Sequence, residues 1–198
     1  ALVAALAVLA GYAAATAPQR LGQPFVDTAR HGWRTRAQPV PGVRLATLPE
    51  GGIRAARWVR AHARPGDVVA TNAHCRSGDI RGRCDSRHFW VAAYTERRVL
   101  VEGWGYTAGA HAQAARTGRS HAVVPYWRPE LLAANEALFR APSPAAADRL
   151  RRAYGVRWLL VDLRVQRPPA GLGRVAALRL RVGRCAVYEL SPAGAPAP

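Results

Sequence analysis

The sequence contains no lysine and no methionine, and acidic residues are few. Of 198 residues, 29 are basic and 12 are acidic, which leaves a formal net charge of +17 that arginine alone carries. Such a charge can indicate a nucleic-acid partner, but phosphate-binding proteins normally use both lysine and arginine. Since alanine is also abundant, the missing lysine favours a biased genome, and we expect no nucleic-acid partner.

Common enzyme motifs are missing too. The chain has no Gly-x-Gly-x-x-Gly or Walker loop for nucleotide phosphates, no Gly-x-Ser-x-Gly elbow and no His-Glu-x-x-His zinc motif. Nucleotide binding and hydrolysis by those routes are therefore unsupported. Hydrophobic residues make up 49% of the chain, which excludes a disordered charged tail, and the length suits one domain with a sizeable core.

An apolar stretch without charge opens the chain. Residues 1–17 read ALVAALAVLAGYAAATA, and Pro18 and Arg20 end the run. A membrane-spanning helix needs about 20 apolar residues, so we interpret residues 1–18 as the end of a transmembrane helix that begins before Ala1. A signal peptide, which would show a methionine and a basic start, and a buried alanine-rich helix stay open as alternatives.

The three cysteines bear on the compartment of the protein. Cys75 and Cys84 lie nine residues apart in HCRSGDIRGRC, a spacing that suits a local disulfide bond in an oxidising compartment. Two free thiols are the second alternative, and a zinc site with His74 and His88 is the third, because no Cys-x-x-Cys is present. Cys185 is expected to be a buried thiol. The arginines after the first apolar run, by contrast, favour the cytoplasmic side.

Pattern and composition divide the chain into four parts. Residues 1–18 are the expected membrane helix end, 19–49 a proline- and arginine-rich linker or extended membrane-proximal segment, 50–190 an α/β domain, and 191–198 a disordered tail. Within the domain, helices are expected between residues 51 and 64 and at 129–140 and 145–154, and strands at 68–71, 99–102 and 156–162. The run 88–94 fits a strand or a helix, 104–127 fits a long loop with room for a short helix, and a hairpin turn is expected near 182–183.

The run VRWLLVD at 156–162 indicates the fold class. It is continuously apolar, which implies a strand buried on both faces, as in a parallel sheet. The sequence therefore predicts an α/β fold with a layered, mostly parallel sheet, flanking helices and a C-terminal antiparallel hairpin, preceded by the end of a transmembrane helix.

Polar and aromatic residues follow the expected strands. Ligands of open α/β sheets bind beyond the carboxyl ends of the strands. We place five candidate binding residues there, Asn72, Glu102, Trp104, Tyr106 and Asp162, and a sixth, Arg87, on the adjoining loop. Rings that can stack on sugars, beside amide and carboxylate groups that can bind hydroxyls, indicate a carbohydrate-like ligand. Structural alternatives stay open: Glu102 and Asp162 can pair with arginines, Asp85 and Arg87 can form a loop ion pair, and the rings can cover a sheet edge. Glu102 and Asp162 could also act as the acid/base pair of a glycosidase.

Three stretches within residues 50–190 carry a resemblance to a known family. They are the helix and strand from Trp58 to Val69, the segment from Arg87 to Leu100 within CDSRHFWVAAYTERRVLVEGWGY, and the strand entry from Tyr154 to Trp158 in YGVRWLLVD. In these stretches the chain resembles the C-terminal extracytoplasmic domain of actinobacterial multi-spanning membrane proteins of the GT-C glycosyltransferase type. Such enzymes depend on polyprenyl-phosphate sugars.

The resemblance implies a soluble domain on the extracytoplasmic side of the cell membrane that helps to recognise the acceptor or the sugar. Its partners would be the lipid bilayer, a polyprenyl-phosphate sugar and a cell-envelope acceptor. The catalytic carboxylate of such enzymes lies in a loop between membrane helices, so this fragment is not expected to catalyse alone. Any divalent metal would belong to that membrane part, and no cofactor or metal site is expected in the fragment. A non-catalytic extracytoplasmic binding or assembly module is the alternative, and an arginine-rich nucleic-acid binder is the least favoured hypothesis.

Overall fold

One open sheet of five strands organises the computed structural model, which describes residues 48–75 and 84–191 of the chain. In spatial order the strands are β2 (Arg98–Val99), β1 (Val68–Thr71), β3 (Val156–Asp162), β5 (Cys185–Leu190) and β4 (Ala176–Val182). The central pairings join β1 to β2 and to β3 in parallel, whereas β5 runs antiparallel to both β3 and β4.

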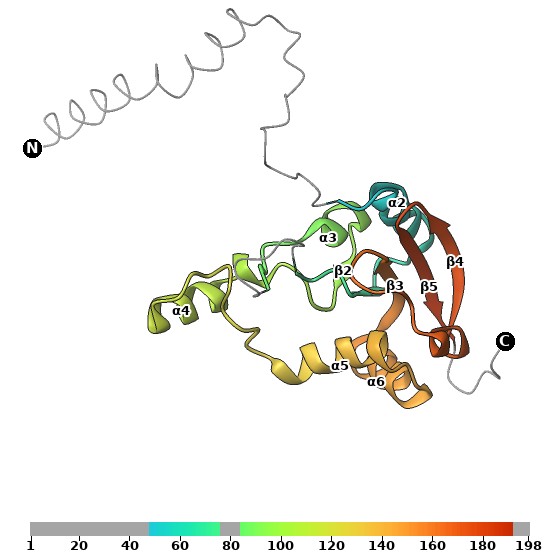
Figure 1. The fold of residues 1–198 in the computed structure, drawn as a ribbon. Helices are drawn as coiled ribbons and strands as arrows, with labels where there is room; N and C mark the ends of the chain where they lie inside the picture. Colours follow the sequence, from blue (N-terminus) through green and yellow to red (C-terminus); the bar gives the residue numbers. More distant parts are fainter. Residues whose placement is uncertain (1–47, 76–83, 192–198) are drawn as a thin grey trace, which may run out of the picture. The chain divides into compact units, whose positions relative to one another are not determined.

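The α/β class, the flanking helices and the C-terminal hairpin are confirmed, but the sheet is mixed rather than mostly parallel. The strand β5 lies between β3 and β4, so two of the four strand pairings are antiparallel. The short turn makes β4 and β5 antiparallel, as predicted, since two strands joined by two residues can pair only antiparallel. The second antiparallel pairing arises because β5, and not β4, lies beside β3. The more buried strand, β5, takes the inner position, and β4, which carries Arg179 and Arg181, forms the edge (Figure 1).

The helices α2 (Gly52–His62), α3 (Trp90–Thr95), α5 (Pro129–Arg140) and α6 (Pro144–Tyr154) flank this sheet. A further helix, α4 (Ala108–Thr117), packs against the short 3₁₀ turn η1 (Trp104–Tyr106) instead, and a second such turn is η2 (Ala170–Arg174). Ser143 caps α6 by accepting a hydrogen bond from the amide of Ala146, and Gly155 ends the helix at a φ of 71°. Pro129 and Pro144 occupy the first turns of α5 and α6, where their missing amide hydrogen costs nothing.

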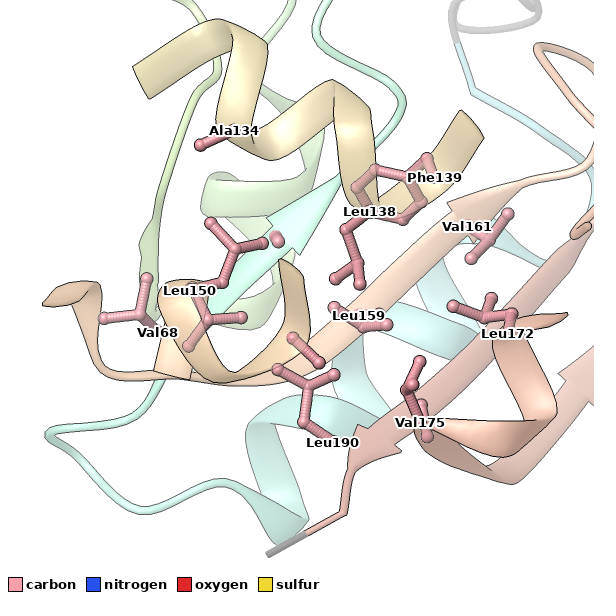
Figure 2. Packing of buried hydrophobic residues seen from close by; sticks show 14 of the residues in the cluster. Val68, Ala134, Leu138, Phe139, Leu150, Leu159, Val161, Leu172, Val175 and Leu190 are labelled. Carbon is pink, nitrogen blue, oxygen red and sulfur yellow. The ribbon is translucent and has the colours of Figure 1, made fainter. Parts of the chain in front are cut away.

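Two hydrophobic layers enclose the sheet. Figure 2 shows Leu138 and Phe139 of α5 and Leu150 of α6 in one cluster with Leu159 of β3. The opposite face is covered by α2 and α3, whose side chains form a second cluster with Trp158 of β3. Because successive side chains of a strand point to opposite faces, β3 is buried on both sides, as its continuous apolar run predicts.

The segment between β1 and α5 differs most from the prediction. The expected strand 99–102 is reduced to two residues, the ambiguous run 88–94 leads into the helix α3, and the expected loop 104–127 contains η1 and α4.

A third hydrophobic cluster explains these differences. Val101 and Trp104 turn away from the sheet and pack with Val124 and Leu131. The indole Nε1 of Trp104 also donates a hydrogen bond to the carbonyl oxygen of Val124 at 2.9 Å. The chain after β2 therefore packs in this cluster rather than in the sheet. The local alternation of apolar and polar residues cannot distinguish these two outcomes.

Two glycines allow the β4–β5 turn to lie against the start of α2. Gly51 and Gly183 have φ angles of 78° and 54°. A Cβ atom on Gly183 would lie 2.4 Å from the carbonyl oxygen of Glu50, and one on Gly51 would lie 2.4 Å from that of Val182. The amide of Arg184 donates to the Glu50 carbonyl oxygen at 2.8 Å. This close backbone contact fixes the position of the turn.

Within residues 48–75 and 84–191, no helix has the length and apolar character that a membrane span requires. The predicted transmembrane end at 1–18, most of the predicted linker and the tail from residue 192 lie outside the described residues. Those parts of the interpretation stay predictions.

Candidate functional site

Asn72 and Asp162 meet where the parallel strands β1 and β3 end. The Asn72 Nδ2 atom donates to the carbonyl oxygen of Asp162 at 3.1 Å, and the Asp162 amide donates to Asn72 Oδ1 at 2.8 Å. Both residues are buried. The side chain of Asn72 therefore extends the pairing of the two strands by one position, and it does so with both of its polar groups.

The carboxylate of Asp162 is engaged as well. It accepts a hydrogen bond from the amide of Arg164 at 2.9 Å, and it is bound by the guanidinium group of Arg164 through Nε at 3.1 Å and Nη2 at 2.8 Å. This two-point ion pair offsets the cost of burying the carboxylate. The contact holds the turn that follows β3. A pair with an arginine is the structural alternative that the sequence left open for Asp162.

A cleft of about 270 Å³ lies beside Asn72. His74 and Glu136 line it, with His74 Nε2 at 3.4 Å from Glu136 Oε1, and the other Glu136 oxygen pairs with Arg140 at 2.8 Å. Burial lowers the pKa of His74, although the Glu136 carboxylate acts against that shift. Glu136 and Arg140 are not among the candidates that the sequence indicates, because the pattern of α5 indicates a helix and not which polar residues meet the end of β1.

Glu102 lies at the amino end of α3. Its two carboxylate oxygens accept hydrogen bonds from the amides of Val91 at 2.9 Å and Ala92 at 2.8 Å. Burial raises the pKa of Glu102 to about 7, and the hydrogen bonds from Ala92 and Val91 limit that rise. The side chain thus caps a short helix and changes its charge near neutral pH.

Two aromatic rings beside Glu102 face the solvent. Phe89 is 52% exposed and Tyr106 is 56% exposed, and the rings meet edge to face with their centroids 5.3 Å apart. With Glu102 and Val99 they line a groove of about 400 Å³. Tyr106 and Glu102 were predicted from the sequence but Phe89 was not, because nothing in HFWVAAY distinguishes its exposed ring from the buried ring of Trp90.

The two remaining candidates are held in internal contacts. Arg87 forms a two-point ion pair with Asp85 through Nε and Nη2, both at 2.9 Å, and these contacts raise the pKa of Arg87. Trp104 is buried in the third hydrophobic cluster. The loop ion pair expected as the alternative for Arg87 is therefore present, and the ring of Trp104 is not presented to a ligand.

Cys75 and Cys84 are joined by a disulfide bond, with their Cα atoms 5.0 Å apart. Both sulfurs are used in that bond, so neither can serve as the thiolate ligand that a zinc site on these cysteines requires. No group of three or more metal-ligating side chains occurs within the described ranges. Cys185 is a buried free thiol, and burial raises its pKa to about 12.

The candidate residues therefore do not all meet in one site. Asn72 and Asp162 lie at the ends of β1 and β3, Glu102 and Tyr106 at the groove beside α3, and Trp104 in the third cluster. Arg87 is half-buried in its pair with Asp85 and lies near Tyr106. No protein-family model matches the chain, and no match is found among curated proteins or solved structures.

Proposed function

We propose that this chain is the extracytoplasmic domain of a membrane protein similar to polyprenyl-phosphate-sugar-dependent glycosyltransferases, and that it binds the sugar or the acceptor without catalysing transfer itself. The observation that carries this proposal is the groove lined by Phe89, Tyr106 and Glu102. Two exposed rings offer apolar faces to a sugar ring, and the neighbouring carboxyl group can bind a hydroxyl.

The carboxylates support binding rather than catalysis. An acid/base pair of a glycosidase needs two carboxyl groups that can exchange protons across the scissile bond. Asp162 is held by Arg164, and Glu102 is held by two backbone amides. Neither side chain is arranged as one half of such a pair.

The side of the membrane is supported by the disulfide bond between Cys75 and Cys84, because such bonds persist in oxidising compartments. Attachment to the membrane rests on the apolar run at residues 1–17 and on the resemblance to the GT-C type. A non-catalytic binding or assembly module of the cell envelope is the second candidate, and the same groove would serve it.

The test is a sugar-transfer assay on the intact protein in the membrane of its host. The double variant Phe89→Ala, Tyr106→Ala removes both rings, and Trp127→Ala is the matched control, since Trp127 is 45% exposed and lies against α4 instead. We expect the double variant to raise KM roughly thirtyfold, because each ring contributes about 1 kcal/mol of stacking, and to change kcat less.

Either of two results would count against the proposal. Equal KM values in the double variant and the unaltered protein would show that the groove does not bind the substrate. No transfer by the unaltered protein would favour the non-catalytic module. For that candidate the decisive measurement is glycan binding by the unaltered protein, the double variant and Trp127→Ala.

A further inference from the structure

A second cleft, of about 590 Å³, lies between the segment after β3 and the β4–β5 turn. Three arginines line it: Arg167 from the segment after β3, Arg181 from β4 and Arg184 from the turn. Tyr188 of β5 and the apolar Leu163 complete the wall. None of these residues belongs to the groove beside α3.

Within the described part of the chain, the three guanidinium groups are not neutralised by ion pairs. Nearby arginines are paired: Arg179 binds Glu189, and Arg164 binds Asp162. Among residues 48–75 and 84–191, no acidic side chain forms an ion pair with Arg167, Arg181 or Arg184. Three positive charges that converge on one concave surface create a field that attracts anions.

Two acidic residues of the described chain lie close to this surface: Asp162, which is buried and paired with Arg164, and Glu50. A Cβ atom on Gly183 would lie 3.1 Å from Cγ of Glu50, so the Glu50 side chain passes beside the turn. It forms no ion pair with the cleft arginines in the part of the chain that the structure describes. A single carboxylate would in any case leave the cleft with an excess of positive charge.

The backbone beneath the cleft is held in place. The amide of Arg184 donates to the carbonyl oxygen of Glu50 at 2.8 Å, and the carbonyl oxygen of Arg184 accepts from the amide of Leu163 at 2.9 Å. Arg181 belongs to the paired part of the hairpin, opposite Ala186. Two of the three arginines therefore project from backbone that is already ordered, which lowers the entropy cost of binding a ligand.

The same face of the hairpin is also partly apolar. Leu178 pairs with Tyr188 across β4 and β5, so the two side chains share a face, and Leu178 is 52% exposed. Burial raises the pKa of Tyr188, so its hydroxyl stays protonated as a donor, and Arg181 acts against that rise. The cleft thus combines three guanidinium groups, one hydroxyl donor and an apolar border.

We propose that this cleft binds a phosphoryl group of a ligand, either a free phosphate compound such as pyrophosphate or the headgroup of an anionic lipid. Guanidinium groups are planar forks that bind phosphate oxygens in pairs, and a cleft of this volume accommodates more than one phosphoryl group or a phosphoryl group with its ester. The site is independent of the sugar-binding groove, and the proposal does not rest on the proposed function.

The experiment titrates the whole chain, purified in a neutral detergent, with inorganic pyrophosphate and with short-chain phosphatidylglycerol by calorimetry. Short-chain phosphatidylcholine is the neutral-lipid reference. The test variant is Arg167→Ala, Arg181→Ala, Arg184→Ala. The matched control removes the same charge from three exposed arginines on or next to α4 and α6 that form no ion pair within the described residues: Arg116→Ala, Arg119→Ala, Arg149→Ala.

We expect the cleft variant to bind at least roughly tenfold more weakly than the unaltered chain, because charge-assisted hydrogen bonds are lost, and the control variant to bind within about threefold. Binding of pyrophosphate alone identifies a free phosphate compound as the source, whereas preference for phosphatidylglycerol over both other probes identifies a lipid headgroup. Equal losses in the two triple variants would show that only the overall charge matters and would overturn the proposal. Absence of binding by the unaltered chain would overturn it as well.

Folding of the variants is checked by circular dichroism. If the triple variant does not fold, the single change Arg181→Lys keeps the charge and the exposed position but removes the fork. Weaker pyrophosphate or phosphatidylglycerol binding by Arg181→Lys supports the proposal, and unchanged binding of both probes contradicts it.

Discussion

At the scale of single residues, Glu102 couples the stability of the protein to pH. Its pKa of about 7 in the folded protein lies above the ordinary value of 4.5, because burial penalises the carboxylate. The folded state therefore holds the proton more tightly than the unfolded state. The resulting stabilisation is complete below about pH 4.5 and is lost as the pH rises through about 7.

The variant Glu102→Gln should lose this dependence, because its side chain stays neutral at every pH. We expect the difference between the melting temperatures of variant and unaltered protein to shift in favour of the variant from about pH 5 to about pH 8. Glu96→Gln is the matched control, since Glu96 forms a surface ion pair with Arg60 and its side chain is 53% exposed. A difference between the melting temperatures of Glu102→Gln and the unaltered protein that stays the same at every pH would contradict the raised pKa of Glu102.

The residue scale also shows how far the sequence predicts the candidate site. The position of Asn72 after β1 could be predicted, because the strand run and its end are visible in the sequence. Its position at the same sheet edge as Asp162 could be predicted too, but the hydrogen bonds that join it to the Asp162 backbone, 90 residues away, could not. The exposure of Phe89 was equally hidden, since exposure of a ring depends on which surfaces the tertiary fold covers.

At the scale of elements, the layer formed by α5 and α6 on the sheet carries much of the core. Leu150 is fully buried and packs in the same cluster as Leu138 and Leu159. Leu150→Ala should lower the free energy of unfolding by about 2–5 kcal/mol, because it removes buried apolar atoms and leaves a cavity. Leu178→Ala is the matched control at 52% exposure and should change it by about 0.5 kcal/mol or less. Urea unfolding of both variants gives the comparison, and equal losses would place Leu150 outside the core.

The disulfide bond between Cys75 and Cys84 also makes a predictable contribution to the free energy of unfolding. Cross-linking two cysteines nine residues apart stabilises the folded chain by about 2–3 kcal/mol through the unfolded state. The double variant Cys75→Ser, Cys84→Ser should lose that amount in urea unfolding, and added reductant should have no further effect on it. Alkylation of both cysteines without reductant, in protein taken from the host, would remove this argument for an oxidising compartment.

Elements with strong local signals were predictable, and those decided by distant packing were not. Ser143, Pro144 and Gly155 mark the ends of α6 in the sequence itself. The two-residue strand β2 and the helices α3 and α4 depend on the third cluster around Trp104, which joins segments far apart in the chain. The turn at Gly183 is visible in the sequence and makes β4 and β5 antiparallel. The sheet becomes mixed because β5 pairs with β3, and that pairing between distant segments cannot be predicted from the turn.

At the scale of the whole molecule, charge is the dominant property. Carboxylates of the described residues are drawn into pairs with arginines, as Asp85, Asp162 and Glu189 show. These pairs leave the net charge of +17 unchanged. Two opposite effects of salt follow: screening weakens the surface ion pairs, and it also reduces the mutual repulsion of the excess arginines.

Repulsion should prevail, because exposed ion pairs contribute little individually, whereas the excess charge acts on the whole folded chain. We therefore expect the melting temperature to rise by a few degrees when sodium chloride is increased from about 0.01 M to about 0.3 M. Pyrophosphate at equal ionic strength should raise it further if the arginine cleft binds it, because a ligand that prefers the folded state adds stability. In Arg167→Ala, Arg181→Ala, Arg184→Ala the chloride effect should persist in reduced form and the additional pyrophosphate effect should disappear. A melting temperature that falls with added chloride would instead show that the ion pairs outweigh the repulsion.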